Sequence, residues 1–239
     1  MKKSVKIIVE AVLAIAIVAL VYAIYSSIME PVKFNKERTR RENVAIQRLK
    51  DIRTLQVAYK SENNKFLSTL DSLSDFYKNG EMTVTLQVGS KDDTTLDEPT
   101  KKAIALIKKG NPKIKTEELN LKLEQMYNAG NKNIRFEKAS KISVKEALKE
   151  QLTASFNPDS IKYIPFSGKQ KIEMESVIKS VSGVEVPLFE ARIPWKKLLK
   201  GMDNQLRINL DAEYRDMNRF EGLQVGSVTA PNNNAGNWE

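Results

Sequence analysis

The sequence contains no cysteine and no histidine. Without cysteine the chain has no disulfide, no thiolate nucleophile and no zinc–sulfur site. Without histidine it lacks the commonest general base and the commonest metal ligand. It also lacks a Walker loop and a G-x-G-x-x-G motif. We therefore expect no enzyme activity, no cofactor and no metal, because any catalysis would have to rest on carboxylates, lysine, tyrosine or serine.

Two short motifs resemble chemical sites but lack the surroundings that the chemistry needs. The acidic segment 92–98 has several carboxylates but neither the spacing nor the glycine of an EF-hand, which favours a solvated loop. Ser176-Val177-Ile178-Lys179 matches S-x-x-K, yet it falls in a predicted strand and its companion motifs are missing. Neither motif predicts a functional site.

Basic charge is concentrated in two blocks of the chain. Residues 1–41 hold eight Lys/Arg against three Asp/Glu, and residues 101–150 hold thirteen against six. The second block has no nucleic-acid recognition motif and few aromatic residues, so it reads as a solvated helical face rather than a nucleic-acid site. The first block contains a juxtamembrane basic cluster, worth about 1 kcal/mol per charge near anionic headgroups: Lys33, Lys36, Arg38, Arg40 and Arg41.

Residues 7–29 predict a transmembrane helix, preceded by a short N-terminal tail of residues 1–6. The run is apolar apart from Glu10 and a polar end, and as a helix it rises about 34 Å, enough to cross a bilayer. A cleaved signal peptide, cut after Ala23, is the alternative. The length of the apolar run and the glutamate inside it favour a retained anchor.

The orientation of this span follows from flanking charge. Lys2, Lys3 and Lys6 favour a cytoplasmic N-terminus, although the basic cluster after the span argues for the opposite. We expect a single-pass protein of the bacterial inner membrane, with its C-terminal domain in the periplasm. Glu10 is costly inside a membrane, and it is either a snorkelling residue without a role or a contact to a partner helix.

Residues 30–100 are expected to begin the soluble domain with a long amphipathic helix. Pro31 marks the exit from the membrane, and apolar or small side chains then recur at helical period, widened by Leu55 and Ala58. We expect this stripe to pack on the soluble domain: Ala45, Leu49, Ile52, Gln56 and Tyr59.

The rest of the chain predicts an insertion followed by a sheet. Residues 101–152 read as a basic helical insertion, with a Ser143 capping box for its last helix. Residues 153–230 read as β-rich, with strands at 161–166 and 223–228 and a hairpin on either side of Ser182-Gly183. Pro187 indicates an edge or bulge. Residues 231–239 form a polar tail. The fold class is α+β, a long helix packed on a small antiparallel sheet.

The N-terminal third resembles a type IV pilin or a type II secretion pseudopilin. The resemblance rests on the apolar helix with Glu10, the unbroken amphipathic helix ending at Tyr59, and a polar turn followed by Phe66. It implies that Glu10 pairs with the N-terminal amine of a neighbouring subunit during assembly. Val5-Lys6 stands where prepilin peptidase would need a glycine, so the chain resembles an uncleaved relative of that family.

Two functions remain open at this point. The first is a non-enzymatic, single-pass subunit of a multiprotein cell-envelope assembly, whose partners are the membrane and other envelope proteins, including copies of itself. The second is a membrane-anchored periplasmic binding or scaffold module unrelated to pilins, whose β-rich half recognises a peptide, a glycan or an envelope partner. We expect no nucleic acid partner and no small-molecule substrate.

Overall fold

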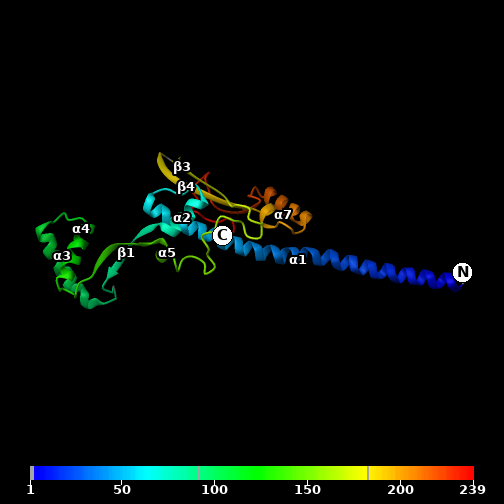
Figure 1. Cartoon of the computed structure of the whole chain (residues 1–239), viewed down its shortest axis with the longest axis horizontal. Coiled ribbons are helices and arrows are strands. Elements are labelled where there is room, and N and C mark those ends of the chain that lie inside the picture. Colours follow the sequence, from blue (N-terminus) through cyan, green and yellow to red (C-terminus); the bar gives the residue numbers. More distant parts are fainter. Residues whose placement is uncertain (1–2, 91, 182) are drawn as a thin grey trace. The chain divides into compact units, whose positions relative to one another are not determined.

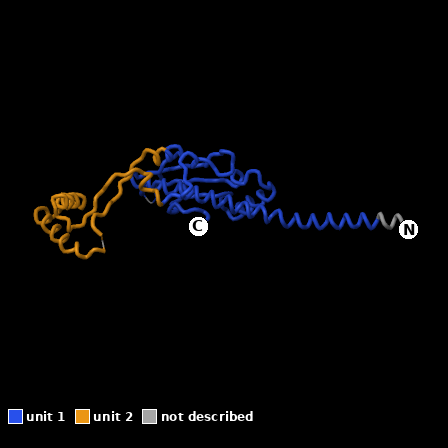
Figure 2. The backbone as a smooth tube through the Cα atoms, turned by 60° about the horizontal axis from the view of Figure 1, so that its bottom comes forward, with its two compact units in different colours: residues 1–74, 151–239 blue, residues 75–150 orange. Residues whose placement is uncertain are grey.

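The computed structural model describes residues 3–90, 92–181 and 183–239, with side chains from residue 9 onward in the first range. It confirms the α+β class: a long N-terminal helix, shorter helices and two small antiparallel sheets (Figure 1). The described residues separate into two compact units, residues 1–74 with 151–239 and residues 75–150 (Figure 2).

Helix α1 runs from Lys3 to Asn63 without interruption and is the longest helix of unit 1. Pro31 lies inside it, although proline lacks the N–H that a helix interior uses and usually breaks or kinks the helix. The helix ends where Asn64 takes a positive φ of 54° and donates its N–H to the carbonyl of Lys60, at 2.8 Å. Asparagine tolerates this left-handed conformation better than most residues, so it suits a helix end.

The sheet of unit 1 has three antiparallel strands in the order β3-β4-β5. β3 (Glu173–Val181) and β4 (Val184–Pro194) form the predicted hairpin, and β5 (Gly222–Gly226) lies on the other side of β4. β5 pairs only with residues 190–194 of β4. Pro187 therefore lies where β4 has a single neighbour, which is the edge position that a proline tolerates.

The C-terminal half of α1 packs on this sheet and on the short helix α6 (Trp195–Leu198). Alternate residues of β4, Phe189, Ala191 and Ile193, are fully buried, and the ring of Phe66 lies 4.7 Å from that of Phe189. Helix α7 (Asn204–Asp216) follows α6, and the Trp195 and Tyr214 rings meet edge to face at 5.6 Å. Burying such large side chains is the main driving force for this unit.

Unit 2 combines a two-stranded ribbon with helices. β1 (Glu81–Val88) pairs antiparallel with β2 (Phe136–Ser143), and the segment between them holds the 3-10 turn η1 (Thr94–Leu96), α3 (Asp97–Gly110) and α4 (Thr116–Asn128). Helix α5 (Val144–Ala147) follows β2. The buried cluster of this unit comes from α3, α4 and β2 with Ile134: Ala103, Leu123, Ile134 and Phe136. Helix α2 (Leu70–Asn79) crosses the division between the units.

Two local predictions differ from the structure. Residues 136–143 were expected to be helical but form β2, because their backbone pairs with β1 along its whole length. The predicted Ser143 cap is confirmed, since its hydroxyl accepts from the N–H of Glu146 at the start of the four-residue helix α5. Residues 161–166 form a loop instead of a strand, and only Tyr163 makes an isolated bridge, to Lys171. The pairing of β1 with β2 also explains why the second unit begins at residue 75 and not at residue 101.

Candidate functional site

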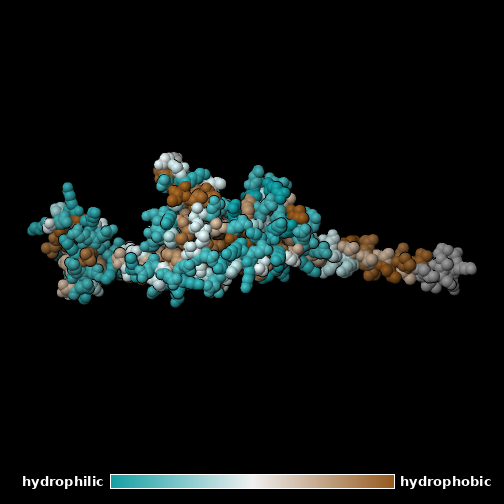
Figure 3. Space-filling view, turned by 45° about the horizontal axis from the view of Figure 1, so that its top comes forward, coloured by the Kyte–Doolittle hydropathy of each residue, from teal (hydrophilic) through white to brown (hydrophobic). Residues whose placement is uncertain are grey.

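Residues 11–25 of α1 are apolar around the whole circumference of the helix, and no other described element packs against them. The side chains from Val9 to Ile28 are largely exposed, with Ile15 at 70% and Val18 at 69%. Figure 3 shows the same stretch as a continuous hydrophobic surface. The helix is long and apolar enough to span a membrane once. A soluble protein rarely leaves so large an apolar surface in water, which makes this segment a candidate membrane contact.

Glu10 lies on the exposed surface of α1 near the start of the apolar run. It is seven residues after Lys3, which corresponds to a rise of about 10 Å along the helix. A carboxylate that close to the end of a span can reach the interface, so its cost is smaller than at the bilayer centre. The position fits both interpretations made from the sequence, a snorkelling residue or a contact to another helix.

The juxtamembrane basic cluster divides into two groups. Lys33 and Lys36 are exposed. Arg40 and Arg41 both bind Glu37, at 2.7 and 2.8 Å, and these two guanidinium groups lower the pKa of Glu37 to about 2.

Two of the arginines also contact other parts of unit 1. Arg41 also donates to the carbonyls of Leu198 and Lys200, at 3.1 and 3.0 Å. Arg38 lies 3.7 Å from Glu42. Arg41 therefore joins α1 to the segment at the end of α6, and Arg40 lies 4.7 Å from the centre of the Phe166 ring, whereas the Arg38–Glu42 pair lies within α1. Lys33 and Lys36 are exposed for contact with headgroups.

The amphipathic stripe faces the protein interior of unit 1. Ala45, Leu49, Ile52 and Gln56 are fully buried, and Tyr59 at the end of the stripe is half-buried. Gln56 is the polar member, and its amide satisfies both backbone groups of Leu67. It donates from Nε2 to the Leu67 carbonyl at 2.8 Å and accepts from the Leu67 N–H at 2.9 Å. The buried amide thus joins α1 to the segment that follows the turn.

Asp51 is a second buried polar group on α1, and it is not part of the predicted stripe. Its carboxylate accepts from the backbone N–H of Thr153 at 3.0 Å and from the Thr153 hydroxyl at 2.8 Å. Burial raises the pKa of Asp51, against the lowering effect of Thr153 and of Arg48. In the sequence, the burial of Asp51 is indicated by its position directly before Ile52, at the border of the apolar stripe.

The polar C-terminal tail, residues 231–239, lies along the free edge of β5. Gly226 donates to the Ala235 carbonyl and Asn237 donates to the Gln224 carbonyl, both at 3.0 Å. The Asn237 side chain extends this pairing, accepting from Gln224 N at 3.0 Å and donating to the Gly222 carbonyl at 2.9 Å. Glu239 pairs with Arg53 of α1 at 2.7 Å. The tail is therefore docked.

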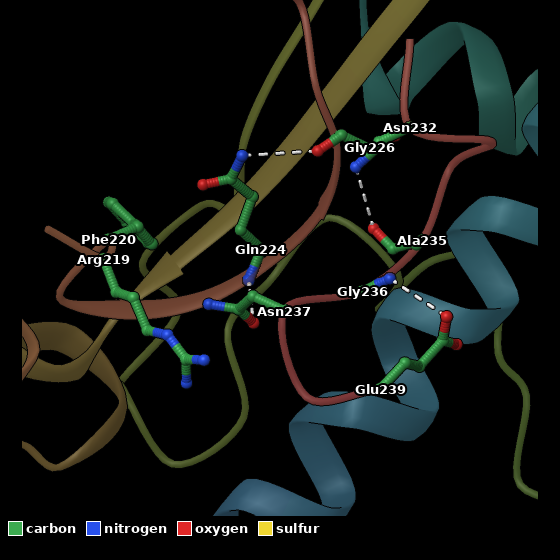
Figure 4. A pocket seen from close by; sticks show the side chains of 9 residues that line it. All are labelled: Arg219, Phe220, Gln224, Gly226, Asn232, Ala235, Gly236, Asn237 and Glu239. Carbon is green, nitrogen blue, oxygen red and sulfur yellow. Dashed lines mark hydrogen bonds between the residues drawn. The ribbon is translucent and has the colours of Figure 1, made fainter. Parts of the chain in front are cut away.

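A pocket of about 330 Å³ lies between this tail and the loop before β5 (Figure 4). Most of its polar groups already bind one another: Glu239 accepts from Gly236 N, and Gln224 donates to the Gly226 carbonyl. Figure 4 shows no such contact for the guanidinium of Arg219. Among the described residues no group of three or more Asp or Glu side chains is placed to hold a metal ion.

Comparisons of this chain with protein-family models, with curated proteins and with solved structures give no match.

Proposed function

We propose that this protein is a non-enzymatic, single-pass membrane subunit of a multiprotein cell-envelope assembly, similar to a pilin or pseudopilin. The observation that carries the proposal is one unbroken helix, Lys3–Asn63, that has an exposed apolar stretch at residues 11–25 and packs on an antiparallel sheet in its second half. A lone apolar helix in a bilayer has exposed surface available for helix–helix contacts. Because the helix continues without a break into its packed half, the membrane span and the sheet of unit 1 are joined by one helix.

In this proposal the span lies in the bacterial inner membrane, with the N-terminus in the cytoplasm and the rest of unit 1, together with unit 2, in the periplasm. Lys33 and Lys36 contact anionic headgroups, and Glu10 contacts a neighbouring subunit within the membrane. The partners are other envelope proteins, including copies of this chain, and not nucleic acid. Burying a carboxylate inside a bilayer costs free energy unless a hydrogen-bond donor or a cation pairs with it.

The experiment is affinity purification of the tagged full-length chain from gently solubilised membranes, with mass spectrometry of its N-terminus and of co-purifying proteins. We expect an intact Met1 end together with other single-span envelope proteins. Glu10→Ala should reduce the recovery of those partners several-fold, whereas Glu30→Ala, a carboxylate of the same helix beyond the apolar run, should not. A chain that begins at Ile24 and elutes alone would contradict both the anchor and the assembly role.

A second candidate function is a membrane-anchored periplasmic binding or scaffold module. The observation that favours it is a pair of adjoining pockets in the β-rich half of unit 1, of about 330 and 360 Å³. Both volumes fall at the lower end of the roughly 300–1,000 Å³ typical of small-molecule sites. Recovery of the chain without partners, but with a saturable ligand, would support this function over the first.

A further inference from the structure

Strand β3 forms one margin of the sheet of unit 1, and most of this margin is unpaired (Figure 1). The opposite margin, along β5, is covered by the tail. Just before β3, the N–H of Ile172 donates to the Lys162 carbonyl at 2.9 Å. Beyond that point, no backbone group of the described residues outside β4 binds the backbone of residues 174–181. β3 therefore has a long free edge.

The register of the hairpin fixes which backbone groups point to this edge. Val181 and Val184 pair across a two-residue loop, and the residues that flank such a loop form a hydrogen-bonded pair. Bonded and non-bonded pairs then alternate along the hairpin. Ile178 therefore falls in a non-bonded pair, opposite Pro187, which has no N–H to donate. The backbone groups that point outward belong to Met174, Ser176, Ile178 and Ser180.

The side chains of these outward-pointing residues lie on the inner face of the sheet. The Met174 sulfur is 3.2 Å from Gln56 Nε2, and the Ser176 hydroxyl is 3.5 Å from the Phe66 carbonyl. Ile178 follows on the same face, beyond that cover, and is 61% exposed. An exposed apolar side chain on an unpaired strand favours pairing with another chain.

The outer face of β3 carries an acidic, an apolar and a basic residue in that order. Glu175 is exposed, Val177 is half-buried and Lys179 is exposed. The Lys179 ammonium donates to the Thr229 carbonyl at 2.6 Å, so it is directed over the sheet toward the segment after β5. A lysine often protects a strand edge from pairing, but this one points away from the edge.

A second copy of this chain does not suit the edge. An antiparallel pair of two β3 strands requires a two-fold axis perpendicular to the sheet. That axis reverses every direction in the plane of the sheet, including that of α1, which packs on the face of the sheet. Two chains anchored in one membrane keep their α1 helices pointing the same way. The partner strand therefore comes from a different protein.

We propose that the free edge of β3 binds an extended segment of another envelope protein, which adds to the sheet as an antiparallel strand. From its N-terminus, this segment carries an acidic residue opposite Lys179, an apolar residue opposite Val177 and a basic residue opposite Glu175. The charged residues then fall in non-hydrogen-bonded pairs, where facing side chains lie closest. The inference rests on the proposed assembly role only for the source of the segment.

The test is a fluorescence anisotropy titration of the full-length protein, in detergent, into a labelled peptide with the sequence of Glu173–Val181. This peptide has the required order of acidic, apolar and basic residues, and without α1 it is free to pair antiparallel with β3. We expect saturable binding with a dissociation constant on the order of 10–100 µM. A peptide with the glutamate of position 175 and the lysine of position 179 exchanged should bind about fivefold or more weakly, because like charges would face each other.

Variants of the protein place the binding at this edge. Ile178→Pro removes an outward N–H but no bond to β4, which an edge strand tolerates. It should weaken binding about tenfold or more, whereas Ile178→Val, which keeps the N–H, should change binding less than about twofold. Denaturant unfolding followed by Trp195 fluorescence checks that both variants fold.

A charge exchange tests the register without disturbing the backbone. Glu175→Lys should weaken binding of the peptide about fivefold, because its lysine would then face a lysine. A peptide with glutamate at position 179 as well as at position 175 should restore it. This second peptide should in turn bind the unmodified protein more weakly than the first.

Three results would overturn the proposal: no saturable binding of the peptide, equal binding by Ile178→Pro and Ile178→Val, or no restoration by the charge exchange. A dimer of the full-length chain that Ile178→Pro dissociates would identify a second copy as the occupant and would also overturn it. The purification with Glu10→Ala tests the assembly role separately, because its outcome does not depend on peptide binding to β3.

Discussion

At the scale of single residues, unit 1 depends on polar side chains that α1 buries. Gln56 is fully buried and Asp51 is 4% exposed, and each binds a segment that is distant along the chain or beyond a turn. Buried polar groups are tolerated when they are fully hydrogen-bonded, and they then select one arrangement of the packed elements. These residues therefore set the register of α1 against the rest of unit 1.

The first prediction concerns the paired hydrogen bonds between Gln56 and Leu67. Gln56→Leu should destabilise unit 1 by about 2 kcal/mol, because the backbone N–H and carbonyl of Leu67 lose their partners. Denaturant unfolding followed by the fluorescence of the fully buried Trp195 measures the change. Val57→Ala, at a neighbouring side chain that is 46% exposed, should change stability by less than about 0.5 kcal/mol. Equal effects of the two substitutions would contradict this role.

The second prediction is a pH dependence at Asp51. Burial raises its pKa above the ordinary value of 3.8, so the folded chain holds this proton more tightly than the unfolded chain. The contribution of Asp51 to stability is therefore fully present below about pH 4 and is lost as pH rises through the raised pKa.

Asp51→Asn removes this titration. Its destabilising effect, measured as the shift in Tm against the unmodified protein, should be larger near pH 4 than at pH 7. An effect that grows as pH rises would show that the hydrogen bonds from Thr153 outweigh burial.

At the scale of elements, the tail protects an edge of the sheet. β5 would otherwise expose its N–H and carbonyl groups, and such edges pair with other chains. The tail covers them with Gly226–Ala235 and Asn237–Gln224 bonds and with the side chain of Asn237. Trp238 lies over Gly236, so closely that a Cβ added to this glycine would come within 2.4 Å of the indole ring.

The third prediction uses that close approach. Gly236→Ala should displace Trp238 and loosen the tail, which a red shift in tryptophan emission and faster proteolysis of residues 231–239 would detect. Gly110→Ala is the matched control, since a Cβ there meets nothing within 4 Å. It also lies at the end of α3, where alanine is favoured over glycine by about 1 kcal/mol. An unchanged emission spectrum for Gly236→Ala would show that the tail does not depend on this packing.

At the scale of the whole molecule, each unit has its own buried residues. The cluster of unit 2 is made by Ala103, Leu123, Ile134 and Phe136, all within residues 75–150. The core of unit 1 is formed by α1, β4, β5 and α6. Domains with separate cores unfold as separate cooperative units.

The fourth prediction follows from these separate cores. Leu123→Ala should cost unit 2 about 2–5 kcal/mol, because the side chain is 2% exposed and its removal leaves a cavity. The unfolding of unit 1, followed by Trp195, should keep its midpoint. Limited proteolysis should then cut residues 75–150 first. A single shared transition that shifts with Leu123→Ala would show that the two units unfold together.

The sequence by itself determined the features that depend on composition and period. The apolar run 7–29 has enough length for a span, the stripe from Ala45 to Tyr59 has the period of a helix, and Ser182-Gly183 separates two strand patterns. Each of these signals comes from residues that are close together in the sequence, so it does not depend on tertiary contacts. The α+β class, the long helix and the hairpin follow from them.

Only the tertiary structure decided the features that depend on distant pairing. Residues 136–143 form a strand because β1 lies alongside them, and the polar tail is ordered because β5 offers a free edge. The pocket with Lys196, Asp211 and Arg219 likewise joins α6, α7 and the start of β5. No local pattern encodes such neighbours, because each backbone or charged group finds its partner only after the chain has folded.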